Sequence, residues 1–430
     1  MDPASPTPVP EYCETFERVW RHANPGAGLD GTVFTPAEQS RHEAKLSALV
    51  DTLTEEASRA RRVRAHSSDI QRRMLANFAD FACGSLGWDP QLFEDRSIAE
   101  FAGALRAFPA LARDFDPTLA PAEIYQAARN VVTMHCLQRL LGIPVRPTAS
   151  TLAYSLLYPY TDNFLDDERV SEADKIAFGR RLADRLAGVP VVPVGSREAR
   201  IFSLVGLIEQ EHDRTARPDV FGALLAIHHA QQESLNLLRT GDELSAADIL
   251  RISVEKGGHS VLADGYLVNG TLTREQAECI YGLGVFLQLR DDLEDVFDDR
   301  AHHQRTVYSA AIGRQTLDEP TARTLAIGQA VLHRLSCFPA ASAGPLRDVV
   351  WRSLKLTVAD AAASVAGSYS PAYLSDLERH SPVRLDYLVR QRQRVARANG
   401  SFTSLLQFWL AESDETEPGR EVATALPIRV

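Results

Sequence analysis

Two clusters of aspartates are the residues of this sequence best suited to carry out chemistry. In the later cluster, Asp291, Asp292 and Asp295 follow an apolar run that reads YGLGVFLQL. On a helix, residues three and four apart lie on one face, so these carboxylates share a face while Glu294 points elsewhere. Like charges at such spacings cost roughly a few tenths of a kcal/mol per pair. The cluster is therefore either a solvent-exposed acidic face or a site that binds cations.

An earlier cluster also places aspartates four residues apart behind an apolar run. Asp162 and Asp166 are four residues apart, Asp167 follows, and an apolar and aromatic run again precedes them. About 130 residues separate the two clusters, which lets them face each other across a helical bundle. Mg²⁺ prefers hard oxygen ligands, keeps several of its waters and is commonly completed by a substrate phosphate. Two acidic walls around one cavity therefore predict several Mg²⁺ ions that hold a diphosphate.

Helices must position both clusters, because a helical period runs through most of the sequence. Apolar residues recur three and four apart in the segments 42–63, 199–214, 220–239 and 274–297, and strand-like alternation is rare. Stretches rich in glycine and proline separate these segments. Ser245 and Thr273 stand where helix N-caps are expected, directly before two of the helical segments. The pattern predicts an all-α fold.

Composition and charge argue against several classes of protein. The chain has 430 residues, 45% of them hydrophobic, and a net charge of −11, which disfavours nucleic acid as a partner. No apolar run reaches the roughly 18 residues of a membrane span. The five cysteines form no CxxC pair, which favours free thiols in the reducing cytoplasm.

We expect four parts along the chain. Residues 1–12, with four prolines, are predicted to form a flexible tail, and 13–115 a helical section packed on the body. The body is expected at 116–412, followed by a C-terminal tail at 413–430.

The second cluster resembles a known motif once its neighbours are included. GVFLQLRDDLED is similar to the second aspartate-rich motif of the trans-isoprenyl diphosphate synthases, with Gly284 and Gln288 in register before the aspartates. Lys256 takes the position of the lysine that faces the diphosphate in that family. The segment AQQES resembles another element of the family, with Ser234 where an aspartate is usual. The resemblance covers roughly residues 150 to 310. It implies the class I isoprenoid synthase superfamily, a helical bundle around a central cavity, and a homodimer.

The sequence departs from the chain-elongating members of this family. No arginine pair follows the first cluster directly, and the early basic element that holds a second diphosphate is absent. One diphosphate site indicates a class I terpene synthase, which ionises a linear prenyl diphosphate and cyclises the allylic cation. The N-S/T-E metal triad of bacterial cyclases is also absent, and the later aspartates stand in its place.

Several alternatives stay open from the sequence. A trans-isoprenyl diphosphate synthase, acting by chain elongation or by head-to-head transfer, remains possible because the spacing of Asp162 and Asp166 suits the head-to-head enzymes. A non-catalytic subunit of a prenyl synthase is disfavoured because both clusters persist. A di-iron protein is disfavoured because no two Glu-x-x-His pairs occur in suitable positions.

The expected site combines metal, diphosphate and hydrocarbon contacts. Three Mg²⁺ ions are expected to bind the substrate diphosphate together with Asp162, Asp166, Asp167, Asp291, Asp292 and Asp295. The diphosphate is expected to contact Lys256, Gln288, Arg290 and Arg305. Aromatic faces stabilise cations by roughly 0.5–2 kcal/mol, so the prenyl chain is expected to contact Tyr158, Phe164 and Phe286. Each of these three aromatic residues could equally be an ordinary core side chain.

Overall fold

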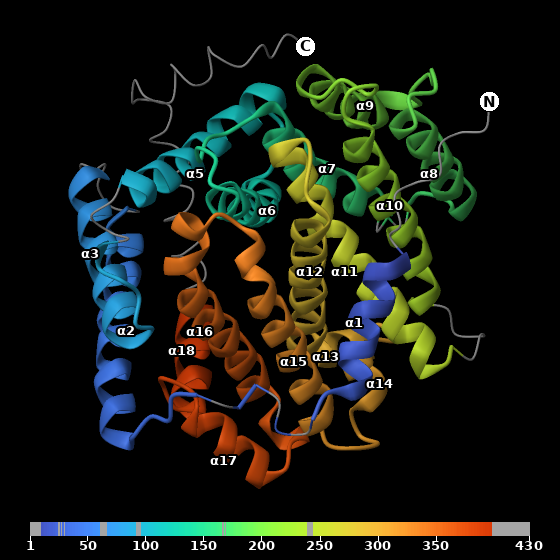
Figure 1. Ribbon diagram of the computed structural model, residues 1–430. Coiled ribbons are helices and arrows are strands. Elements are labelled where there is room, and N and C mark those ends of the chain that lie inside the picture. Colours follow the sequence, from blue (N-terminus) through green and yellow to red (C-terminus); the bar gives the residue numbers. More distant parts are fainter. Residues whose placement is uncertain are drawn as a thin grey trace.

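Helices are the regular secondary structure of the residues that the computed structural model describes. The described residues are 10–24, 26, 28, 29, 31–60, 67–91, 96–165, 167, 169–238 and 244–397. They contain no β-strand, which confirms the predicted all-α fold for this part of the chain (Figure 1). The helices up to the first acidic cluster are α1 (Pro10–His22), α2 (Pro36–Ala60), α3 (Ser67–Ser85), α5 (Arg96–Phe115), α6 (Pro121–Leu140) and α7 (Ala149–Leu165).

The second half of the chain continues in the same way. Between the two clusters lie α8 (Glu172–Leu186), α9 (Gly195–Glu211), α10 (Pro218–Ser234), the short η1 (Leu235–Leu238) and α11 (Ala246–Asn269). The second cluster ends α12 (Arg274–Glu294) and leads into α13 (Val296–Ala301). The remaining elements are α14 (Val307–Ala311), α15 (Asp318–Arg334), η2 (Leu335–Cys337), α16 (Ala340–Ser364), η3 (Ala366–Ser368), α17 (Pro371–Arg379) and α18 (Leu385–Arg397).

Local side chains fix where the central helices begin. Ser245 accepts a hydrogen bond from the backbone N–H of Asp248, and Thr273 accepts one from Gln276. Both predicted N-caps are therefore confirmed, and each forms a capping box that satisfies two backbone donors. At the other end of the chain, α1 begins at Pro10, so the last three residues of the predicted flexible tail are helical. Proline suits a first helical turn because its missing N–H is not needed there.

α11 and α12 are antiparallel and form the centre of the molecule (Figure 1). They are joined by residues 270–273, where Gly270 ends α11 in the left-handed conformation with φ 72°. The helices touch backbone to backbone at Gly257 and Gly284. A Cβ atom at Gly284 would lie 2.1 Å from the carbonyl oxygen of Gly257, so only glycine permits this approach.

The N-terminal helix α1 packs against α11, α12 and α15. Its Phe16 is fully buried, and its ring lies over Gly282, where a Cβ would come within 2.1 Å of the ring. One turn later, α12 carries Phe286, whose ring packs against Gly328 of α15. α12 is thus enclosed by helices from both ends of the chain. How the chain divides into domains stays a prediction.

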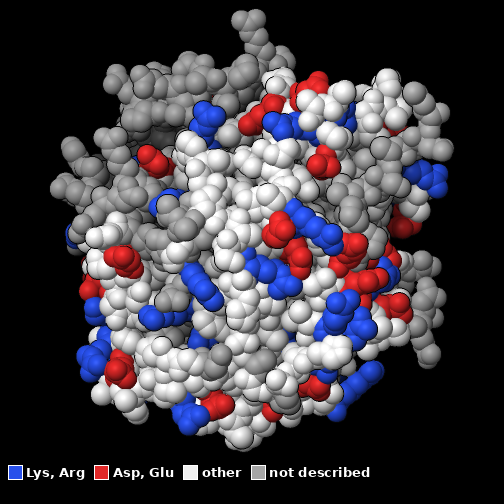
Figure 2. Space-filling view, viewed as in Figure 1, with Lys and Arg blue, Asp and Glu red and all other residues white. Residues whose placement is uncertain are grey.

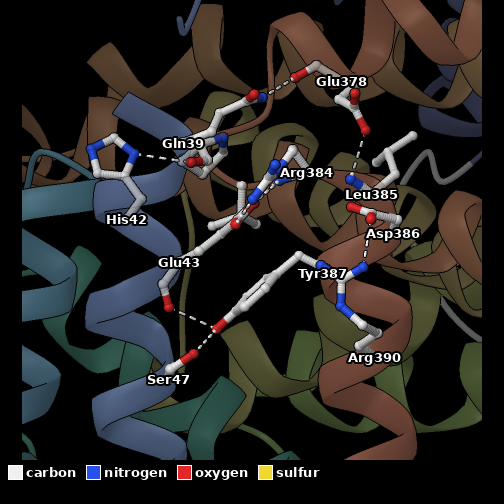
Figure 3. Close-up of polar contacts among 12 residues, drawn as sticks. Gln39, His42, Glu43, Ser47, Glu378, Arg384, Leu385, Asp386, Tyr387 and Arg390 are labelled. Atoms are coloured by element: carbon white, nitrogen blue, oxygen red, sulfur yellow. Dashed lines mark hydrogen bonds and ion pairs between the residues drawn. The ribbon is translucent and has the colours of Figure 1, made fainter. Parts of the chain in front are cut away.

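A polar clamp joins α2 to the C-terminal helices α17 and α18 (Figure 3). The Glu43 carboxylate is buried and accepts hydrogen bonds from the backbone N–H of Arg384 at 3.0 Å and from its Nε at 2.8 Å. The Tyr387 hydroxyl donates to the Glu43 carbonyl at 2.8 Å. Gln39 donates to the carbonyl of Glu378 at 2.8 Å. Segments about 340 residues apart in sequence are therefore held together by buried hydrogen bonds.

Acidic and basic side chains are intermixed over the face seen in Figure 2, where neither sign forms a continuous expanse among the described residues. None of the described helices combines the length and apolar character that crossing a membrane requires. All five cysteines are free, as the sequence predicted.

Candidate active site

The second acidic cluster lies where α12 ends, beside the middle of α11. Asp292 is 3% exposed and turns toward α11. Its Oδ1 accepts a hydrogen bond from Gln288 Nε2 at 2.8 Å, and its Oδ2 accepts one from Ser253 Oγ at 3.2 Å. Gln288 is placed by the backbone contact of the two helices, because its Cβ lies directly over Gly257. The close contact of the helices at Gly257 therefore positions Gln288, which in turn binds the buried carboxylate of Asp292.

Burial raises the pKa of the Asp292 carboxyl to about 7, and the charge of Asp299 adds to the shift. The hydrogen bonds from Gln288 and Ser253 and the charge of Lys256 act in the opposite direction without cancelling it. A carboxylate in this position is short of positive charge. A cation that approached it would be bound in place of a proton.

Asp299, on α13, joins this group although the sequence analysis did not select it. Burial raises its pKa to about 6, with the charge of Asp295 adding to the shift and a hydrogen bond from Thr306 opposing it. Its spacing was a usable signal, since it follows Asp295 by four residues and Asp292 by seven. Reduced hydration, followed by the charges of Glu294 and Asp291, also raises the pKa of Asp295, which is the C-cap of α12.

Lys256 supplies positive charge from α11 and is half-buried. It lies one residue before the glycine crossing and lowers the pKa values of both Asp292 and Asp299. The structure therefore brings together Lys256, Gln288, Asp292, Asp295 and Asp299, of which the sequence predicted all but the last.

Asp291 lies at the same end of α12 as Asp295 and is paired with Arg290. Arg290 Nη1 contacts Asp291 Oδ1 at 2.8 Å, and its Nη2 contacts Glu294 Oε2 at 2.5 Å. Glu294 also accepts from Arg392 of α18 at 3.0 Å. Arg290 is thus engaged by carboxylates of its own helix, while the side chain of Asp291 remains 45% exposed.

The first acidic cluster is described only in part. The backbone of α7 is helical through Leu165, whereas Asp166 and the side chains of Tyr158 and Asp162 lie outside the described residues. The Asp167 carboxylate is held by two hydrogen bonds from Arg169, each 2.8 Å long, and these lower the pKa of Asp167 to about 2.

α7 is anchored just before its acidic end. The Tyr160 hydroxyl donates a hydrogen bond to Asp116, which is 2% exposed and lies between α5 and α6. Thr118 donates to the same carboxylate at 2.6 Å, and Arg200 of α9 pairs with it at 3.2 Å. These contacts fix the helix that carries Asp162.

The remaining predicted residues lie at different places around this group. Phe164 is half-buried, with its ring 4.6 Å from that of Phe178. Phe286 is fully buried on the side of α12 opposite Gln288, as a core side chain is. Arg305 joins the segment after α13 to η1, because its backbone N–H donates to the carbonyl of Leu237 at 3.0 Å.

The donor set suits a hard cation, since it consists of carboxylate oxygens with raised pKa values around one lysine. Within the described residues, no three His, Cys, Asp or Glu side chains converge closely enough to hold an ion by themselves. The second cluster therefore offers one wall of a site, and the remaining ligands would have to come from substrate, water or the first cluster.

Comparison with known proteins adds little to this geometry. No family model matches the chain, and neither does any curated protein. Among solved structures, a polyprenyl synthetase from Streptomyces coelicolor A3(2) matches at 14% sequence identity with a TM-score of 0.29. The match covers 68% of this chain and 99% of that chain. A likeness at this TM-score decides neither the fold nor the function.

Proposed function

We propose that this protein is a Mg²⁺-dependent class I terpene synthase, which ionises a linear prenyl diphosphate and cyclises the resulting cation with release of diphosphate. The observation that carries the proposal is the group at the α11–α12 crossing. There, the pKa values of Asp292 and Asp299 are raised although Lys256 lies nearby. The positive charge of this one lysine is therefore not enough to balance the two carboxylates. Such a group is suited to bind divalent cations that in turn hold a diphosphate.

The residues of this chain would divide the work. Asp291, Asp292 and Asp295 would hold Mg²⁺ on the α12 wall, with Asp162 and Asp166 on the α7 wall. When bound, the three Mg²⁺ ions supply Lewis-acid stabilisation of the departing diphosphate. Gln288 and Ser253 hold the carboxylate of Asp292 in one orientation through their hydrogen bonds. Lys256 adds positive charge where negative charge develops on the leaving group.

The arginines that follow the first cluster support cyclisation rather than chain elongation. An elongating enzyme needs cationic side chains that are free to hold a second diphosphate. Of the six arginines at 169–200, four are paired closely with carboxylates of the protein, in the pairs Arg169–Asp167, Arg181–Glu198, Arg185–Glu209 and Arg200–Asp116. Arg197 lies 3.9 Å from Asp167, and Arg180 is exposed. A second diphosphate could bind any of these four arginines only by breaking its ion pair, and three of the pairs are bidentate.

Product analysis tests the proposal. The purified protein is incubated with Mg²⁺ and with geranyl, farnesyl, geranylgeranyl or geranylfarnesyl diphosphate, each with and without isopentenyl diphosphate. Diphosphate release is measured and products are identified by mass spectrometry. We expect a hydrocarbon or alcohol from one allylic substrate alone. A longer diphosphate that forms only with isopentenyl diphosphate would refute cyclisation in favour of elongation, and the absence of any turnover would indicate a non-catalytic subunit.

A further inference from the structure

Asp264 is a buried carboxyl group that no part of the diphosphate site uses. It lies on α11 with 0% exposure, between α11, α6 and α7. Asn130 Nδ2 of α6 donates to its Oδ1 at 3.0 Å and to Ser155 Oγ of α7 at 3.3 Å. The Oδ2 atom is buried and has no hydrogen-bond partner. An unpartnered buried carboxyl oxygen costs free energy, so its presence calls for a reason.

The position of Asp264 on α11 relates it to the proposed site. Ser253, Gly257, Ser260 and Asp264 are spaced by four, three and four residues, which places them along one face of the helix. This face carries the contacts to Asp292 and Gln288 at one end. Asp264 lies eight residues after Lys256, or about 12 Å further along the axis.

On α7, too, the residue that belongs to the Asp264 group lies about two turns from the acidic cluster. Ser155 lies seven residues before Asp162, two turns earlier on the same face of the helix. α7 and α11 also touch one turn before Asp264, where the Tyr154 hydroxyl donates to the carbonyl of Ser260 at 3.3 Å. The Asp264 group therefore lies about two turns from the acidic clusters along both helices. On the proposed function, the hydrocarbon end of a prenyl diphosphate would extend toward this level.

The surroundings of Asp264 favour its neutral form. Burial raises the pKa of this carboxyl well above its ordinary value, and only the hydrogen bond from Asn130 opposes the shift. In the neutral acid, Oδ1 accepts the hydrogen bond from Asn130, so the proton resides on the unpartnered Oδ2. The carboxylate left after loss of this proton keeps the same hydrogen bond, which is stronger toward a charged acceptor.

We propose that Asp264 is an acid and base for carbon, protonating a double bond of the bound hydrocarbon and later taking a proton back. The inference rests on the proposed function. In the first step the O–H bond of Asp264 breaks, the π electron pair of an alkene forms a new C–H bond, and the neighbouring carbon becomes cationic. After further ring closure, a C–H bond beside the final cation breaks. Its electron pair forms the new double bond, and the proton returns to the Asp264 carboxylate.

The neutral polyene that Asp264 protonates would arise from the first cyclisation. The cation formed by the first cyclisation loses a proton to the released diphosphate, which acts as the base, and the neutral polyene results. The proposal therefore places two cyclisation stages in one pocket, the first begun by ionisation near Lys256 and the second by protonation at Asp264.

A single-turnover experiment in D₂O tests this role. The full-length protein is equilibrated in D₂O and used in excess over the prenyl diphosphate that it converts. We expect one deuterium in each product molecule of the wild type. Asp264→Asn preserves shape and can still accept the Asn130 hydrogen bond, but it has no carboxyl proton. It should release diphosphate at a rate close to that of the wild type, while the labelled product falls by about 100-fold or more and a less cyclised, unlabelled hydrocarbon replaces it.

The matched control is Glu43→Gln, which alters another buried carboxyl, in the clamp between α2 and the C-terminal helices and outside the proposed pocket. It should retain the labelled product, whatever its effect on thermal stability. An unlabelled wild-type product, or the same labelled product from Asp264→Asn, would overturn the proposal. If Asp264→Asn lowered only the melting temperature, Asp264 would be a structural link between α6, α7 and α11. Absence of diphosphate release from the wild type would instead refute the proposed function itself.

Discussion

Replacing the buried Asp292 by asparagine should stabilise the metal-free protein while abolishing its turnover. The carboxyl is 3% exposed, and burial raises its pKa to about 7 from an ordinary value of 3.8. Ionisation of this group therefore costs more in the folded chain than in the unfolded chain. Asparagine has nearly the same shape, carries no charge and can still accept the hydrogen bond from Ser253.

The size of the effect follows from the pKa difference. About three pKa units at about 1.4 kcal/mol each give about 4 kcal/mol, which is an upper value because neighbouring groups titrate together. The folded carboxyl holds its proton more tightly, so the stabilisation is complete below about pH 4 and is lost as the pH rises to about 7. The free energy of unfolding of the wild type should fall across this window. In Asp292→Asn, this decrease in the free energy of unfolding should be smaller than in the wild type by up to about 4 kcal/mol.

Urea unfolding in EDTA at pH 4 and pH 8 measures this difference. Asp298→Asn is the matched control, because Asp298 belongs to the same acidic segment but is exposed. We expect Asp292→Asn to be more stable than the wild type at pH 8, and Asp298→Asn to keep the wild-type pH dependence. An Asp292→Asn protein that is less stable than the wild type at pH 8 would refute the reasoning, since burial of the charge would then not be costly.

Three further outcomes are expected. Asp291→Ala should abolish turnover without loss of helical circular dichroism, whereas Glu294→Ala, which loses only ion pairs to arginine, should remain active; equal activity of both variants would remove Asp291 from the site. Gly284→Ala should lower the free energy of unfolding by about 1–3 kcal/mol in urea titrations, because its Cβ would meet the carbonyl of Gly257. Gly103→Ala, where a Cβ meets nothing, should cause no loss, and a matching loss there would contradict the packing argument. Chelation of divalent metal should abolish diphosphate release and added Mg²⁺ should restore it, and release that persists in EDTA would refute the metal requirement.

Local features of the fold could be predicted from the sequence, because their causes lie within a few residues. The helical period and the caps at Ser245 and Thr273 belong to this kind. The contact of Arg290 with Glu294 could also have been predicted from its spacing of four residues.

Features that depend on the packing of distant segments could not be predicted in this way. Spacing alone did not show that Asp292 turns inward while Asp291 stays half-exposed, because this depends on how α11 crosses α12. Asp299 carried a signal in its spacing, but its burial beside Asp292 depends on how α13 packs beyond the end of α12 at Asp295. The clamp between Glu43 and Arg384 joins residues that are 341 positions apart, and nothing in the sequence around either residue indicates that the two would meet.

The contact between Gly257 and Gly284 also affects how this protein could evolve. It joins the helices of Lys256 and Asp292 through backbone atoms, so the spacing between the lysine and the carboxylates does not depend on which side chains fill the rest of the bundle. We expect substitutions around Ser155 or Asn130 to leave this spacing unchanged. On the proposed function, new products could arise by mutation of the deep part of the pocket while the machinery that releases diphosphate is inherited intact.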